Sequence, residues 1–291
     1  MDATLNQILR LAPRIVRPPW GGTRLSTRFG KGQSGERVGE SWEVWRDNVI
    51  EGGVWHGRRL GEVVDLPLLV KLVDVAGVLS VQVHPGDADA ARLEGAANGK
   101  AEGWVVLEAA EDARIAWGLR RTMTRDELRA RAESGEIEQD LSWIPARAGA
   151  VIDVPPGTIH TLSGEVLFYE VQQPSDLTYR LYDWGRDRPL HLDRAVAVTK
   201  QPDSGPHPKP MYLEPGRTRL MAGEKFEVER VEVPLLPRLQ LPEWAAVTLV
   251  AGRVDLDEEP LRAGTSVVAR GNFSTRGAGV LLVAREQRQK S

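Results

Sequence analysis

Two short segments place a histidine at the end of a strand-like run, and histidine is a common metal ligand and proton carrier near neutral pH. In residues 80–84, strand alternation with a period of two puts Ser80, Gln82 and His84 on one face. In residues 151–160, a strand-like run ends in a Pro-Pro-Gly turn that presents His160. Spacing alone leaves two interpretations of the first segment open: a solvated strand face, or ligands that line a cavity.

Lys100 and Glu102 precede a third apolar run, which starts at Trp104. Taken alone, this charged pair is typical of a turn at the surface. The chain contains no cysteine, which excludes disulfides, thiolate zinc sites and cysteine nucleophiles. Any metal must therefore be held by histidine, carboxylate or amide side chains.

The composition bounds the class of protein. Of 291 residues, 41% are apolar and 27% are charged, as expected for a globular chain with more than one domain. The net charge of -3 argues against binding to nucleic acid or to an anionic membrane through bulk charge. Lys71 and Asp74 interrupt the most apolar stretch, residues 66–83, so we predict no membrane span. No secretory signal opens the sequence, and we expect a cytoplasmic protein.

Glycine and proline are scattered among short apolar runs, which is typical of a mainly β chain with many turns. A capping box formed by Thr124 and Glu127 predicts a helix that stops near Gly135. Two further short helices are predicted at residues 87–97 and 2–10. Strands of the first part of the chain are predicted at residues 68–73, 78–84, 104–107, 113–117, 150–154, 166–172 and 178–182.

Between Lys200 and Gly216 the chain carries five prolines, a density that is incompatible with a sheet. The last part of the chain contains no histidine, so the chemistry is assigned to the first part. Its acidic cluster at residues 255–259 is interpreted as a solvated turn. We therefore predict three parts: a metal-binding catalytic domain at 1–200, a Pro-rich connection at 201–216 and a smaller C-terminal β-domain at 217–291.

The motifs that contain the histidines are similar to those of the cupin superfamily. The spacing from Gly149 to His160 resembles the second cupin motif, and Gln82 with His84 resembles the first, with Gln82 in place of its first histidine. Segments in matching order resemble the short bacterial form of type I phosphomannose isomerase (mannose-6-phosphate isomerase): residues 19–22, 39–42, 68–74 with 79–85, 99–104, 156–160 and 170–184.

This resemblance implies a mainly β fold: a cupin-type (jelly-roll) β-barrel domain with a few short helices, followed by a smaller cupin-like β-domain. It implies interconversion of mannose 6-phosphate and fructose 6-phosphate by proton transfer through an enediol. It also implies one Zn²⁺ per chain, with other divalent ions as alternatives. The implied metal ligands are Gln82, His84, Glu102 and His160.

The resemblance further implies Arg180 and Lys100 as catalytic cations. Because an arginine keeps its proton at neutral pH, Arg180 is assigned to charge stabilisation, and the identity of the general base stays open. The implied substrate-binding residues are Ser80, Lys71, Glu40 and Glu170. The alternative interpretation of Lys71 is a side chain that reaches the surface or pairs with Glu40.

The expected partner is a small phosphorylated sugar, and the expected assembly is a monomer or a homodimer. Rival hypotheses are another metal-dependent cupin enzyme, such as an oxygenase or a different sugar-phosphate isomerase, and a non-catalytic sugar-phosphate-binding cupin. Gln82 argues against oxygen chemistry, and the presence of Lys100, Glu102 and Arg180 argues against loss of catalysis. Of the other histidines, His191 is predicted to be structural, and His56 and His207 are predicted to face solvent.

Overall fold

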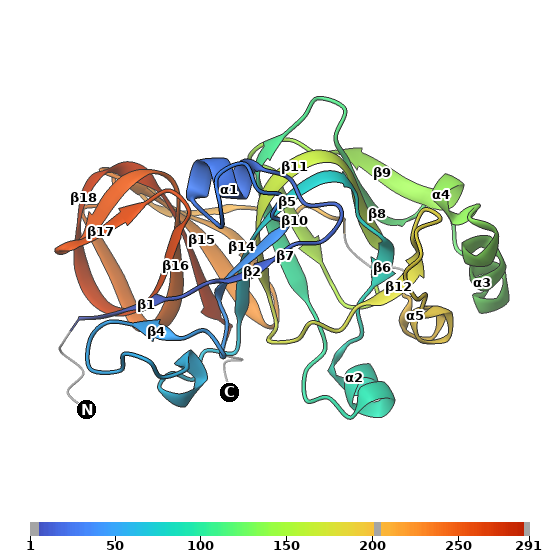
Figure 1. Cartoon of the computed structure of the whole chain (residues 1–291), viewed down its shortest axis with the longest axis horizontal. Helices are drawn as coiled ribbons and strands as arrows, with labels where there is room; N and C mark the ends of the chain where they lie inside the picture. The colour runs from blue at the N-terminus through green and yellow to red at the C-terminus, as the bar shows by residue number, and fades with distance from the viewer. Residues whose placement is uncertain (1–5, 201–204, 288–291) are drawn as a thin grey trace. The chain divides into compact units, whose positions relative to one another are not determined.

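The computed structural model describes residues 6–200 and 205–287, which form two compact units (Figure 1). Unit 1 comprises Met1–Asp74, Tyr169–Val171 and Pro208–Ser291, and unit 2 comprises Val75–Phe168 and Gln172–His207. The mainly β architecture with few helices, predicted from the sequence, is confirmed. The division into domains that the sequence predicts, with boundaries at residues 200 and 216, stays a prediction.

Two long strands contribute residues to both units: β5 (Leu69–Val78) and β11 (His160–Gln172). Both are almost entirely buried along the stretches where they change unit. Buried residues follow one another there without alternation, as in strands that are covered on both faces.

Unit 1 contains an eight-stranded sheet in the order β13-β14-β15-β18-β1-β4, with β16 and β17 joined to it. Its core is mainly aliphatic and includes Val231, Leu239 and Val247, together with the aromatic Phe273. The elements of this unit are β1 (Gln7–Leu11), β2 (Arg14–Val16), α1 (Arg24–Phe29), β3 (Glu40–Val44), β4 (Ile50–Glu51), the 3-10 helix η1 (Leu60–Glu62), β13 (Met211–Glu214), β14 (Arg217–Ala222), β15 (Phe226–Val233), β16 (Arg238–Leu256), β17 (Glu259–Arg262) and β18 (Thr265–Glu286).

Strands β16 and β18 close the C-terminal part of unit 1 on itself. Ala246 of β16 pairs with Val268 and also with Ala284, so one segment of β16 lies between the two halves of β18. Figure 1 shows the curved ribbon of β16, β17 and β18 that results. Closure of this kind leaves fewer unpaired strand edges.

Unit 2 carries the short strands and helices that surround the predicted ligands. Two helices, α3 and α5, pack against β12 and cover a core that includes Val83, Leu128 and Val196. The elements are β6 (Val81–Val83), α2 (Asp87–Glu94), β7 (Glu102–Ala109), β8 (Arg114–Leu119), α3 (Arg125–Ser134), α4 (Ile137–Asp140), β9 (Leu141–Pro145), β10 (Val151–Val154), β12 (Tyr179–Tyr182) and α5 (Leu192–Val198).

Two of the predicted helices are confirmed. The Thr124 hydroxyl accepts a hydrogen bond from the Glu127 N–H at 3.2 Å, and Gly135 ends α3 with φ 78°. Helix α2 occupies most of the predicted range 87–97. Local capping signals were sufficient here because each helix end is determined by residues close in sequence.

The predicted helix at residues 2–10 is wrong where the structure describes it. Residues Gln7–Leu11 form strand β1, which pairs with β18 and β4; residues 2–5 lie outside the described part. The partner of Gln7 is Arg270, so the hydrogen bonds that decide the conformation come from the far end of the chain. A local pattern carries no information about such a partner.

The predicted strand at residues 78–84 is interrupted. β5 ends at Val78 and β6 begins at Val81. The Leu79 carbonyl accepts hydrogen bonds from the Thr161 hydroxyl at 2.8 Å and from Trp184 Nε1 at 2.6 Å, instead of a strand partner. Within the described residues, no helix combines the length and apolar character needed to cross a membrane.

Candidate metal centre

Three neighbouring strands of unit 2 bring their polar side chains to one face of the sheet. Gln82 of β6 is paired with His160 of β11 on one side and with Arg180 of β12 on the other. Directly paired residues in antiparallel strands project to the same face. The sheet therefore aligns Gln82, His160 and Arg180 in one row.

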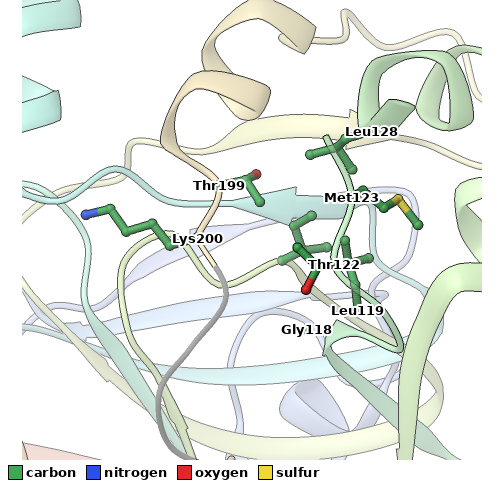
Figure 2. A pocket seen from close by; sticks show the side chains of 8 residues that line it. Gly118, Leu119, Thr122, Met123, Leu128, Thr199 and Lys200 are labelled. Atoms are coloured by element: carbon green, nitrogen blue, oxygen red, sulfur yellow. The ribbon is translucent and has the colours of Figure 1, made fainter. Parts of the chain in front are cut away.

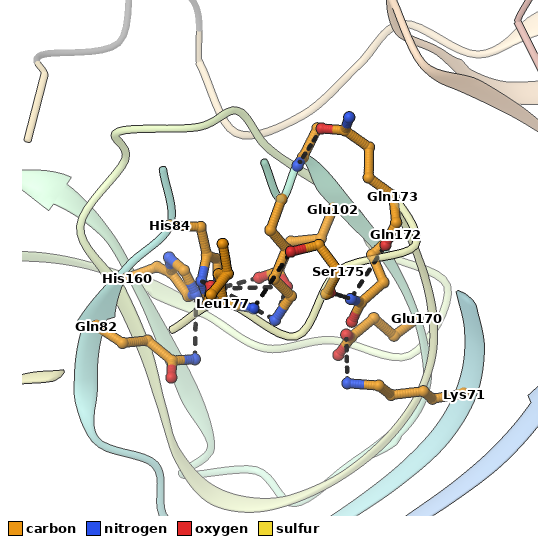
Figure 3. Close-up of polar contacts among 12 residues, drawn as sticks. Lys71, Gln82, His84, Glu102, His160, Glu170, Gln172, Gln173, Ser175 and Leu177 are labelled. Atoms are coloured by element: carbon orange, nitrogen blue, oxygen red, sulfur yellow. Dashed lines mark hydrogen bonds and ion pairs between the residues drawn. The ribbon is translucent and has the colours of Figure 1, made fainter. Parts of the chain in front are cut away.

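His84, Glu102 and His160 converge into one buried group, and their potential ligand atoms all lie within 4.8 Å of one another (Figure 3). The Glu102 carboxylate lies 3.5 Å from His84 Nε2 and 3.1 Å from His160 Nε2. None of the three side chains is more than 2% exposed. The structure thus brings together three of the four ligands that the sequence predicted.

Gln82 joins this group through its amide, whose Nε2 lies 3.2 Å from His160 Nε2. The two ends of an amide differ little in shape, so a half-turn exchanges the nitrogen for the oxygen. In that orientation the Gln82 oxygen is a potential ligand beside His160. Its assignment as a ligand stays a prediction.

Each histidine is held in a defined tautomer by a backbone carbonyl. His84 Nδ1 lies 2.9 Å from the Leu177 oxygen, and His160 Nδ1 lies 2.9 Å from the Thr158 oxygen. Because a carbonyl only accepts, Nδ1 must carry the hydrogen in both neutral rings. Both Nε2 atoms therefore present a lone pair to Glu102, as metal-bound histidines oriented by an outer hydrogen bond do.

The charges of the site favour the ligand forms of these groups. Burial, followed by the nearby Lys100 ammonium, lowers the pKa of His84 to about 3, so the ring is neutral at pH 7. Burial alone would raise the pKa of Glu102, but the Lys100 ammonium beside it holds that pKa well below its usual range. The site thus contains a carboxylate and a neutral imidazole.

A divalent ion fits this donor set. Glu102 Oε1 is buried and accepts no hydrogen bond from the described residues, and the Nε2 of His160 lies 3.1 Å away and is an acceptor in the neutral ring that a metal requires. Two facing acceptors repel each other, whereas a cation between them would satisfy both. Nitrogen and oxygen donors without thiolate are compatible with Zn²⁺ and with other divalent ions.

Lys100 lies at the edge of the same group. Its Nζ is 2.9 Å from Glu102 Oε2 and 3.3 Å from His84 Nε2, and the side chain is 5% exposed. The sequence taken alone suggested a charged surface turn for Lys100 and Glu102, whereas the structure buries both side chains. Lys100 is a buried cation beside the carboxylate.

Ser80, which was predicted to bind substrate, is buried. Its hydroxyl lies 3.5 Å from Gln82 Oε1. Arg180 lies in the row described above, and its Nη1 donates to the Pro189 carbonyl at 3.1 Å.

The other histidines lie outside this group. His191 accepts from the Arg180 backbone N–H at 3.1 Å, which matches the structural role predicted for His191. His56 and His207 are exposed, as predicted.

In unit 1, Lys71 is buried between two carboxylates. Its Nζ lies 3.5 Å from Glu40 and 3.3 Å from Glu170, and 5.0 Å from the centre of the Trp42 ring. A buried ammonium requires such partners, because desolvation otherwise disfavours the charge. The pairing with Glu40 weighed from the sequence is present, and the role of these residues in substrate binding stays a prediction.

A pocket of about 190 Å³ in unit 2 contains none of the predicted site residues (Figure 2). Apolar side chains of Leu119, Met123, Leu128 and Ile159 line most of it. Figure 2 shows the Lys200 ammonium pointing away from the other side chains. The pocket has no convergent polar groups, which are expected of a site that binds a polar substrate.

The sequence missed the backbone groups that orient the histidines. The carbonyls of Leu177 and Thr158 carry no residue-type signal, because every residue has one. The turn before His160 was visible as Pro-Pro-Gly, and Gly157 there has φ 90° with the Val198 oxygen 2.9 Å from the place a Cβ would occupy. A larger residue at this position would disturb the turn that presents His160.

No family model matches the chain. The curated mannose-6-phosphate isomerase of Streptococcus mutans serotype c is 32% identical over 290 residues, covering 89% of this chain and 91% of that protein. The crystal structure of the mannose 6-phosphate isomerase from Bacillus subtilis has a TM-score of 0.85 at 28% identity, covering 96% of this chain and 99% of that one.

A further solved structure, a mannose 6-phosphate isomerase bound with zinc and yttrium, has a TM-score of 0.73 at 15% identity and covers 97% of this chain and 100% of its own. At that identity it shows the shared fold alone. The cupin-type architecture and the family resemblance predicted from the sequence are confirmed. Because 32% identity extends over 89% of the chain, the protein belongs to the mannose-6-phosphate isomerase family and is an enzyme of that type.

Proposed function

We propose that the chain binds one Zn²⁺ among Gln82, His84, Glu102 and His160 and interconverts mannose 6-phosphate and fructose 6-phosphate. One observation above all supports a metal site. Carbonyls fix the Nδ1 atoms of two imidazoles, and the Nε2 atoms of both rings face one buried carboxylate. The family relationship supports the reaction, and a relative of the same fold binds zinc.

The reaction transfers a proton between C2 and C1 of the sugar through an enediol. Its barrier is the weak acidity of the carbon, so the site must stabilise negative charge on the sugar oxygens. A bound divalent ion would supply Lewis-acid stabilisation of those oxygens. The chain adds fixed positive charge from Lys100 and Arg180.

Arg180 is suited to binding oxygens and not to proton transfer, because its guanidinium keeps its proton at neutral pH. Its strand position beside Gln82 orients it to the face that carries His160. Lys100 is held by Glu102 and His84, which positions its ammonium at the ligand group. The general base is not assigned.

The substrate-binding set proposed here is Ser80, Lys71, Glu40 and Glu170. The Ser80 hydroxyl lies next to Gln82, and the other three residues form the buried ion cluster of unit 1. Buried, paired charges are suited to recognition of sugar hydroxyls and phosphate because their geometry is fixed before the ligand arrives. The monomer or homodimer and the cytoplasmic location stay predictions.

A coupled assay of fructose 6-phosphate formation from mannose 6-phosphate tests the proposal. We expect turnover that falls to the uncatalysed level after treatment with a chelator and returns when Zn²⁺ is added. Direct detection of the ketose phosphate formed from glucose 6-phosphate and from pentose 5-phosphates separates this reaction from that of another sugar-phosphate isomerase. Full turnover in demonstrably metal-free protein would contradict the metal assignment.

A further inference from the structure

The backbone between two site residues is held by a single residue, Gln173. Ala101 lies between Lys100 and Glu102, and its N–H donates to Gln173 Oε1 at 3.0 Å. Its carbonyl accepts from the Gln173 backbone N–H at 3.1 Å. Both backbone polar groups of Ala101 are therefore directed to Gln173, which fixes how Lys100 and Glu102 leave the chain.

Asp87 determines which way the Gln173 amide points. Gln173 Nε2 donates to Asp87 Oδ1 at 2.9 Å, and the same oxygen accepts from the Gly99 N–H at 2.8 Å. Because a carboxylate only accepts, the amide nitrogen must face Asp87 and the amide oxygen must face Ala101. The Gln173 side chain is buried, so a wrong orientation would leave polar groups unsatisfied.

The segment that contains Gly99 lies directly against the turn after His84. A Cβ on Gly99 would lie 2.4 Å from the Pro85 oxygen, and the Lys100 N–H donates to that oxygen at 2.9 Å. Asp87 therefore connects the backbone on the Glu102 side of the site to the backbone that follows His84. Gln173 completes this connection.

The same loop orients His84. Leu177, four residues after Gln173, supplies the carbonyl that fixes the His84 tautomer at 2.9 Å. Within the loop, Gln172 donates from Nε2 to the Ser175 carbonyl, and the Ser175 N–H donates to the Gln173 carbonyl at 2.7 Å. Figure 3 shows these side chains beside His84 and Glu102. The loop of residues 172–177 thus contacts His84 directly and Glu102 through the backbone of Ala101.

We propose that Gln173 is a positioning residue for the metal group, held in its working orientation by Asp87. It acts on Glu102 through the backbone of Ala101, and it shares a loop with the carbonyl that orients His84. This inference rests on the proposed function, because the group that Gln173 positions is the proposed metal centre. Loss of such outer hydrogen bonds costs about 10–100-fold in metal affinity.

The test is binding of Zn²⁺ and of Co²⁺ to the whole chain, depleted of metal and titrated against a chromogenic chelator. Gln173→Glu keeps the shape of the side chain but places a second carboxylate against Asp87. We expect a Zn²⁺ affinity lower by about 10–100-fold and a changed visible spectrum of bound Co²⁺. A purely structural role would lower the melting temperature without altering the Co²⁺ spectrum.

Three further variants complete the experiment. Gln139→Glu makes the same change on the exposed face of α4 and should leave affinity and spectrum unchanged. Gln173→Met keeps the length without hydrogen bonds and replaces Gln173→Glu if that chain does not fold. Asp87→Asn combined with Gln173→Glu exchanges donor and acceptor between the two side chains, and it should recover at least part of the lost affinity.

The outcomes separate this inference from the proposed function. A wild-type chain that binds neither ion would overturn both. A wild type that binds both ions, beside a Gln173→Glu chain with the same affinity and spectrum, would overturn this inference alone. A double variant with no recovery would overturn the role of Asp87.

Discussion

Two histidines and one glutamate form the candidate metal site in unit 2, and hydrogen bonds to the far sides of the two rings decide which nitrogen is free. His84 and His160 each direct Nδ1 to a carbonyl at 2.9 Å, which leaves both Nε2 atoms for Glu102 or a metal. Burial lowers the pKa of His84 to about 3, so this ring does not become cationic in the physiological range. The group thus has the arrangement of a set of potential metal ligands.

Replacing either histidine should abolish stoichiometric metal binding. We expect His84→Ala and His160→Ala to lower the metal content from about one ion per chain to near zero, because each removes one of few strong donors. Elemental analysis of the purified proteins measures this directly. His56→Ala, at an exposed position, is the matched control. Equal metal content in all four proteins would place the metal elsewhere.

Arg180→Lys should not be a conservative change. Arginine offers a planar fork of donors to sugar oxygens, whereas lysine is a point charge on a flexible stem. We expect kcat to fall by about 10²-fold or more, the scale of a lost oxyanion donor.

Arg147→Lys, on the exposed turn before β10, is the control for the Arg180 variant. Steady-state kinetics at equal metal content separates kcat from KM. A kcat close to that of the wild type, in a folded Arg180→Lys protein, would remove Arg180 from the catalytic set.

At the scale of elements, the loop after β12 holds the segment that leads into β6. Asp183 accepts from Arg186 Nη2 and from Arg188 Nε, both at 2.6 Å. Arg186 also donates to the Val78 carbonyl at 2.8 Å, and Trp184 donates to the Leu79 carbonyl at 2.6 Å. These bonds satisfy the backbone where β5 ends, just before the residues that carry Gln82 and His84.

Asp183→Asn should destabilise the protein by about 3 kcal/mol at pH 7, because it leaves two arginines without their buried partner. Burial alone would raise the pKa of Asp183, but the bonds from Arg188 and Arg186 hold it below its usual value. A depressed pKa contributes stability above the unfolded-state value, about pH 4, and that stability is lost as the pH falls further.

The difference between wild type and Asp183→Asn should therefore be constant from about pH 5 to 8 and shrink below about pH 4. Denaturant unfolding at several pH values measures it. Asp187→Asn, exposed in the same loop, should show almost no difference at any pH. A difference that grows on acidification would contradict the assigned role of Asp183.

At the scale of the whole molecule, the C-terminal part supplies a closed β structure and no histidine. Its acidic cluster is more than a solvated turn, since Asp257 accepts from Asn6 Nδ2 at 2.7 Å and from the Ser274 N–H at 2.8 Å. Glu259 forms an ion pair with Arg10. These contacts join the N-terminal segment to the C-terminal strands within unit 1.

We expect Asp257→Asn and Glu259→Gln to leave turnover within about twofold, because partly exposed polar contacts of this kind contribute mainly small changes in stability. Asparagine also tolerates the positive φ of 53° at position 257. Turnover at equal metal content, together with the melting temperature, provides the measurement. A large fall in turnover with unchanged metal content and melting temperature would assign catalysis to this part as well.

Residue types and local spacing marked only part of the candidate site. The alternation around Gln82 and His84 and the Pro-Pro-Gly turn before His160 made these residues candidates, whereas Lys100 and Glu102 were assigned through the family resemblance, because their spacing alone is typical of a surface turn. The helix from Arg125 was also predictable, because its cap and its end depend on neighbours in sequence. Such signals survive without knowledge of the fold.

Tertiary structure decided the rest, because it joins groups that are far apart in the chain. Strand β1 exists because β18 and β4 supply its hydrogen bonds. The tautomers of His84 and His160 depend on the carbonyls of Leu177 and Thr158, and a carbonyl is the same in every residue. The sequence by itself offered the side chains that could bind a metal, because only histidine, carboxylate and amide ligands occur in a chain without cysteine, and the folded backbone determined which nitrogen of each ring is free to do so.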